Sequence, residues 1–145
     1  MVPIMDSQKR YACVVHECCH AITALSLGYN VRIKIHDEPD DRGAVGNILW
    51  GGDDNPVEHK LMVTFSPALF DILNDDVGQE STDCNKFDLA NIRSLLSDKS
   101  EEESVKMLEE AAEKIVVILE EHDRDLKCLV HDVESGMEVF TPEYL

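Results

Sequence analysis

Two histidines and a glutamate lie close together near the start of the chain, in the order His16-Glu17-Cys18-Cys19-His20. In an α-helix, residues four apart lie on one face, so His16 and His20 can bind the same metal ion. Glu17 lies about 100° around the helix from His16, which places its carboxylate beside the ion. This H-E-x-x-H spacing is typical of zinc sites in which the glutamate acts as a base on water.

Zinc suits this pattern because a catalytic zinc site uses three protein ligands and keeps one position for water, whose pKa falls to about 7. The spacing therefore predicts Zn²⁺ as cofactor, Glu17 as the catalytic base and peptide-bond hydrolysis as the reaction. The simplest alternative is a surface His-Glu pair without function. The segment around the motif is apolar, however, and burying two unpaired imidazoles would be costly. Metal binding removes that cost.

The motif lies in a segment with helical periodicity, residues 7–27, which Gly28 is expected to end. Its apolar positions recur at helical spacing: Tyr11, Val14, Val15, Cys18, Ile22 and Leu25. Strict alternation over residues 31–35 predicts a half-buried strand. Residues 44–50, between glycines, predict a second strand, and the two strands imply a small sheet.

The rest of the chain is expected to be mainly helical. Residues 57–73 predict a helix that Pro67 should kink or split, and the polar residues 75–86 predict a loop. Further helices are expected from Asp88, as its N-cap, over the amphipathic residues 100–121, and over residues 123–131. With 145 residues and 43% hydrophobic content, we expect one α+β, mainly α domain over residues 1–145, with a small β-sheet and the His16 helix at its centre.

Composition excludes several classes of function. The 13 basic and 30 acidic residues give a formal charge of −17, which disfavours binding to nucleic acids and anionic lipids. A protein that mimics DNA stays open as an alternative. Five cysteines without regular spacing, and no basic-then-apolar leader, favour a cytoplasmic location. The most apolar segment, residues 12–28, is shorter than the roughly 20 residues of a membrane-spanning helix, so we expect no membrane association.

The residues after the motif extend it as His20-Ala21-Ile22-Thr23-Ala24-Leu25-Ser26-Leu27-Gly28. With this extension the segment resembles the peptidase domains of FtsH-type AAA proteases, which read roughly HEAGHAxxAxxLG. Arg42-Gly43-Ala44-Val45-Gly46 resembles that family's RGxALG edge strand. Residues 62–73, 119–122 and 134–139 are similar to its small-residue helix and its closing segment. The resemblance covers nearly the whole chain, and only its first motif is specific.

The resemblance implies a third zinc ligand, an aspartate that opens a later helix and precedes an apolar residue. Asp88, followed by Leu89, fits this pattern, and Asp83 is a competing choice with a poorer apolar rhythm after it. We therefore expect His16, His20 and Asp88 to hold the zinc ion. The ordinary alternative for Asp88 is a helix cap.

The resemblance also implies that Gly43, Ala44, Val45 and Gly46 belong to an open edge strand that binds a protein or peptide substrate. Such a strand supplies main-chain hydrogen bonds without demanding a sequence, and glycines let the substrate approach closely. The alternative is a hairpin flanked by glycines.

The chain departs from the family pattern in three respects. Cys18-Cys19 replaces Ala-Gly, no GxxxxGK[ST] phosphate loop occurs, and no membrane anchor is found. A stand-alone peptidase would act on unfolded or flexible segments. The departures keep open a second class, a peptidase-like module that binds or inhibits without cutting. The apolar stripe of residues 101–121 is expected in the core, and a homo-oligomer is the alternative.

Overall fold

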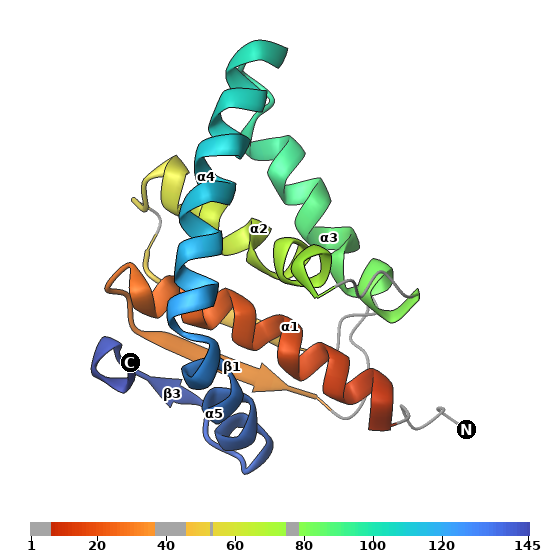
Figure 1. Ribbon diagram of the computed structural model, residues 1–145, viewed down its shortest axis with the longest axis vertical. Helices are drawn as coiled ribbons and strands as arrows, with labels where there is room; N and C mark the ends of the chain where they lie inside the picture. The colour runs from red at the N-terminus through yellow and green to blue at the C-terminus, as the bar shows by residue number, and fades with distance from the viewer. Residues whose placement is uncertain (1–6, 37–45, 53, 75–78) are drawn as a thin grey trace.

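The computed structural model describes residues 7–36, 46–52, 54–74 and 79–145, and the side chains of residues 10–36, 46–52, 54–74 and 85–145. Within these residues the protein is mainly helical, with a small antiparallel sheet (Figure 1). The coarse fold expected from the sequence, α+β and mainly α, is therefore confirmed. None of the described helices combines the length and the hydropathy that a bilayer crossing demands.

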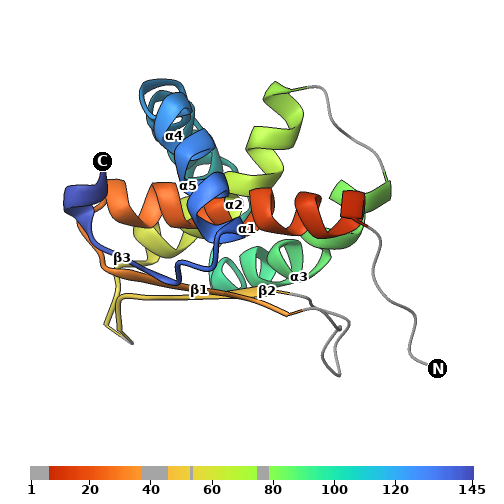
Figure 2. The same ribbon diagram turned by 90° about the horizontal axis from the view of Figure 1, so that it is seen from below.

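The helix that carries both histidines, α1 (Ser7–Ser26), lies at the centre of the fold. The sheet covers one side of it, and the other helices pack around the rest (Figure 2). Ala21, Ile22 and Ala24 are completely buried although they point to different sides of the helix, as expected of a helix that is apolar all round. Gly28, at φ +95°, ends the segment, because a left-handed residue there favours glycine. The predicted central helix is confirmed.

The sheet has the strand order β2-β1-β3. The strands are β1 (Val31–Ile35), β2 (Gly46–Trp50) and β3 (Val139–Phe140), all antiparallel to their neighbours. Alternate residues of β1 are buried and exposed, so the first predicted strand is confirmed. The described part of the second predicted strand is also confirmed. The short strand β3 was not predicted, because two residues carry no periodicity and pair with β1 only through the tertiary fold.

Helix α2 (Val57–Leu73) is continuous through Pro67, so the expected split does not occur. The helix is fixed to α1 by buried hydroxyl groups. Ser66 Oγ donates a hydrogen bond to the main-chain oxygen of Met62 at 2.6 Å, and Thr23 Oγ1 lies 2.6 Å from Ser66 Oγ. Because the single Ser66 hydrogen is already used, Thr23 is the donor in the second bond.

Helix α3 (Gln79–Leu95) corrects the sequence prediction. Residues 79–86, expected to be part of a loop, are helical, and Asp88 lies in the middle of the helix instead of capping it. The physical reason is that the first turns of α3 are polar, so no apolar periodicity marks them. Residues 75–78 of the predicted loop lie outside the described residues.

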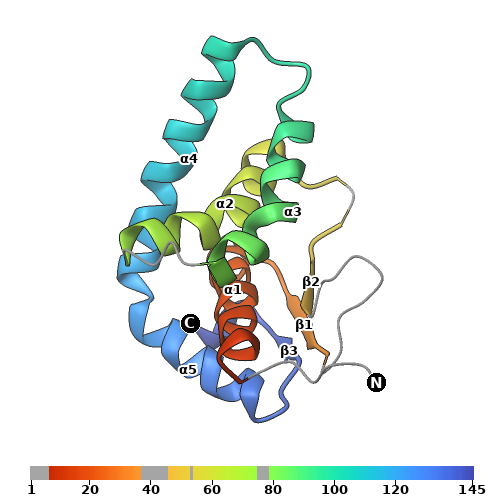
Figure 3. The ribbon, with the colours of Figure 1, turned by 90° about the vertical axis from the view of Figure 1, so that its right-hand side faces the viewer.

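Two further helices complete the fold. In α4 (Glu101–Glu121) the Ser100 hydroxyl accepts a hydrogen bond from the main-chain N–H of Glu103, which caps the helix start. The amphipathic helix predicted here is confirmed, with Ile115 and Leu119 in the core. Helix α5 (Asp123–Glu134) is longer than expected, and a short 3₁₀ helix (Pro142–Tyr144) follows β3. Figure 3 shows α3 and α4 extending past α2, away from α5.

Candidate metal centre

His16 and His20 project from the same side of α1 towards α3. Their side chains are nearly buried, with 9% and 5% of the residue surface exposed. The two imidazole rings lie 4.8 Å apart, centre to centre, with their planes at 84°. The helical spacing therefore brings the two rings together, as the sequence predicted.

Asp88 reaches the two imidazoles from α3. Its Oδ2 atom lies 2.8 Å from Nε2 of His16 and 3.0 Å from Nε2 of His20. All three potential ligand atoms lie within 4.8 Å of one another, and among the described residues this is the group that can hold a metal ion. Of the two aspartates that the sequence offered, Asp88 is the one placed here. The side chain of Asp83 lies outside the described residues.

The position of Asp88 Oδ2 between the two imidazoles also fits a metal ion. Oδ2 is buried, yet no donor reaches it with hydrogen-bond geometry despite the two short distances. The separations of 2.8 and 3.0 Å are a few tenths of an ångström below the roughly 3.3 Å between ligand atoms of a tetrahedral zinc site. Zinc binding would move Asp88 Oδ2 away from the two imidazoles, and the three ligand atoms, which lie within 4.8 Å of one another, would adjust to the ion. Two imidazoles with one carboxylate are a donor set that zinc accepts.

The orientation of His20 is fixed from α2. Its Nδ1 atom lies 2.6 Å from the main-chain oxygen of Val63, in a buried contact. A carbonyl oxygen only accepts, so Nδ1 carries the hydrogen. Nε2 of the neutral ring then has a free lone pair, which faces Asp88. This tautomer is the one that binds a metal through Nε2.

His20 and Asp88 shift each other's pKa so that the charged form of each is favoured. Burial alone would lower the pKa of His20, but the contact with Asp88 outweighs it and raises that pKa to about 9. Burial would raise the pKa of Asp88, but the contacts with His16 and His20 lower it to about 2. Asp88 is therefore an anion at neutral pH, which is the form that binds a cation.

Glu17 stands beside the three ligand candidates without joining them. It is 9% exposed. Burial raises its pKa, and the nearby His20 and His16 partly oppose that rise. A carboxylate in such a place can exchange a proton at neutral pH more readily than an exposed glutamate. Glu17 is therefore close enough to His16, His20 and Asp88 for their charges to affect its pKa.

Gly46, the first residue of β2, lies directly against Glu17. A Cβ atom at position 46 would come within 3.0 Å of Glu17 Cγ and 2.9 Å of Ile35 Cδ1. Either side chain would have to move. The edge strand therefore lies close to Glu17, and a larger residue at position 46 would press on the Glu17 side chain.

We expect Gly46→Ala to displace Glu17 and to lower any activity that uses Glu17 as a base about tenfold, a part of the 10²–10⁴-fold contribution of a well-placed general base. The zinc content should not change, because none of the ligand candidates is among the three nearest neighbours of a Cβ atom at position 46. Gly52→Ala is the matched control, since a Cβ there meets nothing within 4 Å. Equal activity of both variants would show that Gly46 does not control the position of Glu17.

Two further predictions concern the substrate strand and the two adjacent cysteines of α1. Gly43, Ala44 and Val45 of the predicted substrate strand lie outside the described residues. Cys18 and Cys19 are completely buried, and burial raises the pKa of both thiols. They pack as small apolar side chains, since a metal ligand would need the thiolate.

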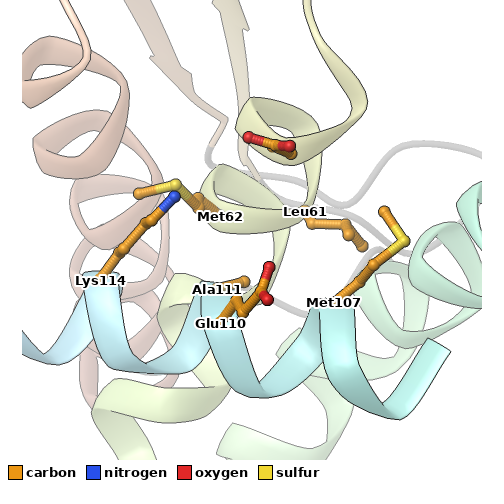
Figure 4. A pocket seen from close by; sticks show the side chains of 7 residues that line it. Leu61, Met62, Met107, Glu110, Ala111 and Lys114 are labelled. Atoms are coloured by element: carbon orange, nitrogen blue, oxygen red, sulfur yellow. The ribbon is translucent and has the colours of Figure 1, made fainter. Parts of the chain in front are cut away.

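A small pocket of about 30 Å³ lies elsewhere, between α2 and α4 (Figure 4). Its volume is that of one or two water molecules. None of the ligand candidates lines it; the labelled residues are Leu61, Met62, Met107, Glu110, Ala111 and Lys114. The chemistry therefore does not depend on this pocket.

Sequence reasoning missed one functional group, the main-chain oxygen of Val63 that orients His20. No side-chain pattern marks a main-chain acceptor. The signal that could have found it is Pro67, because a proline inside a helix leaves the carbonyl four residues earlier without its usual partner.

Comparison with known proteins adds no relative to this geometry. No protein-family model matches the chain, and no curated protein matches it either. The inference about function therefore depends on the residues of this chain and on their arrangement.

Proposed function

We propose that the protein is a zinc-dependent metallopeptidase that hydrolyses peptide bonds in unfolded or flexible protein segments, similar to the FtsH-type peptidases but without their ATPase module. One observation carries the proposal. Nε2 of His16, Nε2 of His20 and Oδ2 of Asp88 converge from two helices, and the buried carboxylate of Glu17 stands next to them.

His16, His20 and Asp88 would hold the ion. Zinc in such a site supplies a Lewis acid and lowers the pKa of water to about 7. The protein contributes a carboxylate that is already anionic, a main-chain oxygen that holds a hydrogen on Nδ1 of His20, and surroundings that exclude most solvent. These features orient the ligand side chains before the metal binds.

Glu17 would move the protons of the reaction. Its carboxylate accepts a proton from the attacking water as the oxygen adds to the substrate carbonyl carbon. The same proton then passes to the leaving nitrogen as the C–N bond breaks, so that a carboxylic acid and an amine are released. A glutamate whose pKa is raised by burial is suited to both transfers. It binds the proton of the water more readily than an exposed glutamate does, and it can still pass that proton to the leaving nitrogen.

The edge of the sheet would hold the substrate. Within the described residues, β2 pairs with β1 on one side and with no strand on the other. An extended peptide can add to such an edge through main-chain hydrogen bonds. Because Gly46 touches Glu17, a peptide bound there would pass next to the base. Binding of this kind reads the backbone, which suits unfolded segments of many sequences.

The experiment that tests the proposal is cleavage of an unfolded protein by the purified chain. The protein is assayed as prepared, after removal of metal with a chelator, and after return of one equivalent of Zn²⁺. We expect cleavage that disappears with the metal and returns with zinc. Zinc binding without cleavage would instead favour a module that binds its targets, and absence of zinc binding would refute the metal centre itself.

A further inference from the structure

Pro67 lies inside α2, where a proline is unfavourable. In a regular helix the N–H of residue 67 would donate to the main-chain oxygen of Val63, four residues earlier. Proline has no N–H, so this oxygen loses its helical partner. Val63 is 1% exposed, so solvent cannot replace the partner, and a buried acceptor without a hydrogen bond would be costly.

The oxygen finds its partner in the candidate metal centre. Nδ1 of His20 lies 2.6 Å from it, and the contact is buried. Helix α2 contributes no ligand candidate, yet it holds one ligand in place. The carbonyl of the preceding residue has another partner: the main-chain oxygen of Met62 accepts a hydrogen bond from the Ser66 hydroxyl. The acceptor that Pro67 leaves without a helical partner is therefore the one that contacts His20.

We propose that Pro67 is a positioning residue for the metal centre: by lacking an N–H, it reserves the main-chain oxygen of Val63 for Nδ1 of His20 and so keeps Nε2 of His20 free to bind the metal. This inference rests on the proposed zinc site and names a residue that no ligand pattern includes. It also explains why a continuous helix contains an unfavourable residue.

The test is Pro67→Ala, which restores an N–H that competes for the Val63 oxygen. A proline inside a helix is less favourable than alanine, so the metal-free variant should unfold at the same temperature as the wild type or higher. Its Zn²⁺ affinity should nevertheless fall about 10- to 100-fold, the usual effect of losing a hydrogen bond to a ligand histidine. A purely structural role would move both quantities in one direction.

Ser66→Ala is the matched control in the same turn. It removes the acceptor of Thr23 and the donor to Met62, so its unfolding temperature should fall, while its Zn²⁺ affinity should stay within about twofold of the wild type. The opposite responses of these two variants would support the proposal. Equal zinc affinities of Pro67→Ala and the wild type would overturn it.

A second variant separates the missing N–H from the proline ring. Lactic acid incorporated at position 67 gives an ester that has the alanine side chain and no N–H. We expect it to bind Zn²⁺ more tightly than Pro67→Ala and close to the wild type. If the ester binds as weakly as the alanine variant, the ring itself matters and the proposal fails.

The ring nitrogens of His20 provide a measurement that does not depend on peptidase activity. At a pH above the His20 pKa of about 9, where the ring is neutral, ¹⁵N chemical shifts of the metal-free wild type should show its hydrogen on Nδ1, and in Pro67→Ala the Nε2-protonated form should gain population. If the protein binds zinc but cuts nothing, the proposed function fails while this inference is still supported or refuted by the shifts. An unchanged tautomer in Pro67→Ala refutes it.

Discussion

Glu17→Gln is expected to lower the rate of peptide cleavage by about 10²–10⁴-fold, the usual contribution of general acid–base catalysis. Glutamine has nearly the same shape and remains compatible with the buried position, but it cannot accept a proton. The zinc content and the unfolding temperature should stay close to those of the wild type, because Glu17 is not among the converging ligand atoms.

The measurement is kcat/KM on an unfolded protein, together with metal analysis of the same samples. Glu109→Gln, on the exposed side of α4, removes the same charge far from the site and should have normal activity. A Glu17→Gln variant that retains full activity would show that another group moves the proton. Equal inactivity of wild type and variant would point to a binding module.

Asp88→Ala is expected to lower the zinc affinity by more than about 100-fold. Residues that only contact a ligand already contribute about 10- to 100-fold, so removal of a ligand should cost more. The loss is also electrostatic, because Asp88 is the anion between the two imidazoles.

Thermal unfolding with and without zinc makes this loss measurable. Zinc at a hundredfold excess over its Kd stabilises the wild type by about 2.7 kcal/mol, which is roughly 8 °C for a chain of this length. Asp88→Ala should show almost none of this increase. Asp83→Ala should behave like the wild type, since positions 83 and 88 are about 140° apart around a helix. The reverse result would make Asp83 the ligand.

The sequence predicted the parts of the fold that repeat locally. The apolar rhythm around His16 and the amphipathic residues of α4 each extend over several turns, so their periodicity is clear. The alternation in β1 is equally clear. These elements place both histidines, and the spacing within one helix was enough to predict that the two rings meet.

The start of α3 shows what a periodicity cannot predict. The residues after Gln79 are polar, so the helix seemed to begin at Asp88, and Asp88 was interpreted as its cap. In the structure the helix starts earlier, and Asp88 faces α1 from the middle of it. The structure places Asp88 beside the two histidines, as expected, but its predicted position at the start of the helix was wrong.

Contacts between elements could not be predicted from periodicity either. The hydrogen bond from His20 to Val63 and the contact between Gly46 and Glu17 join segments that are far apart in the sequence. Neither depends on a repeating pattern. Each is nevertheless associated with a residue that is unusual in its element, a proline in a helix and a glycine in a strand.

Within the described residues, the side of β2 away from β1 pairs with no strand, so its hydrogen-bonding groups can pair with other copies of the protein as well as with other chains. Such edges are sites of aggregation, and Leu49 on this strand is 60% exposed. The formal charge of −17 makes identical copies repel one another at short range, over a Debye length of about 8 Å at physiological ionic strength. The acidic charge thus opposes aggregation of identical copies. Chains that are less acidic than the protein can still reach the edge of β2.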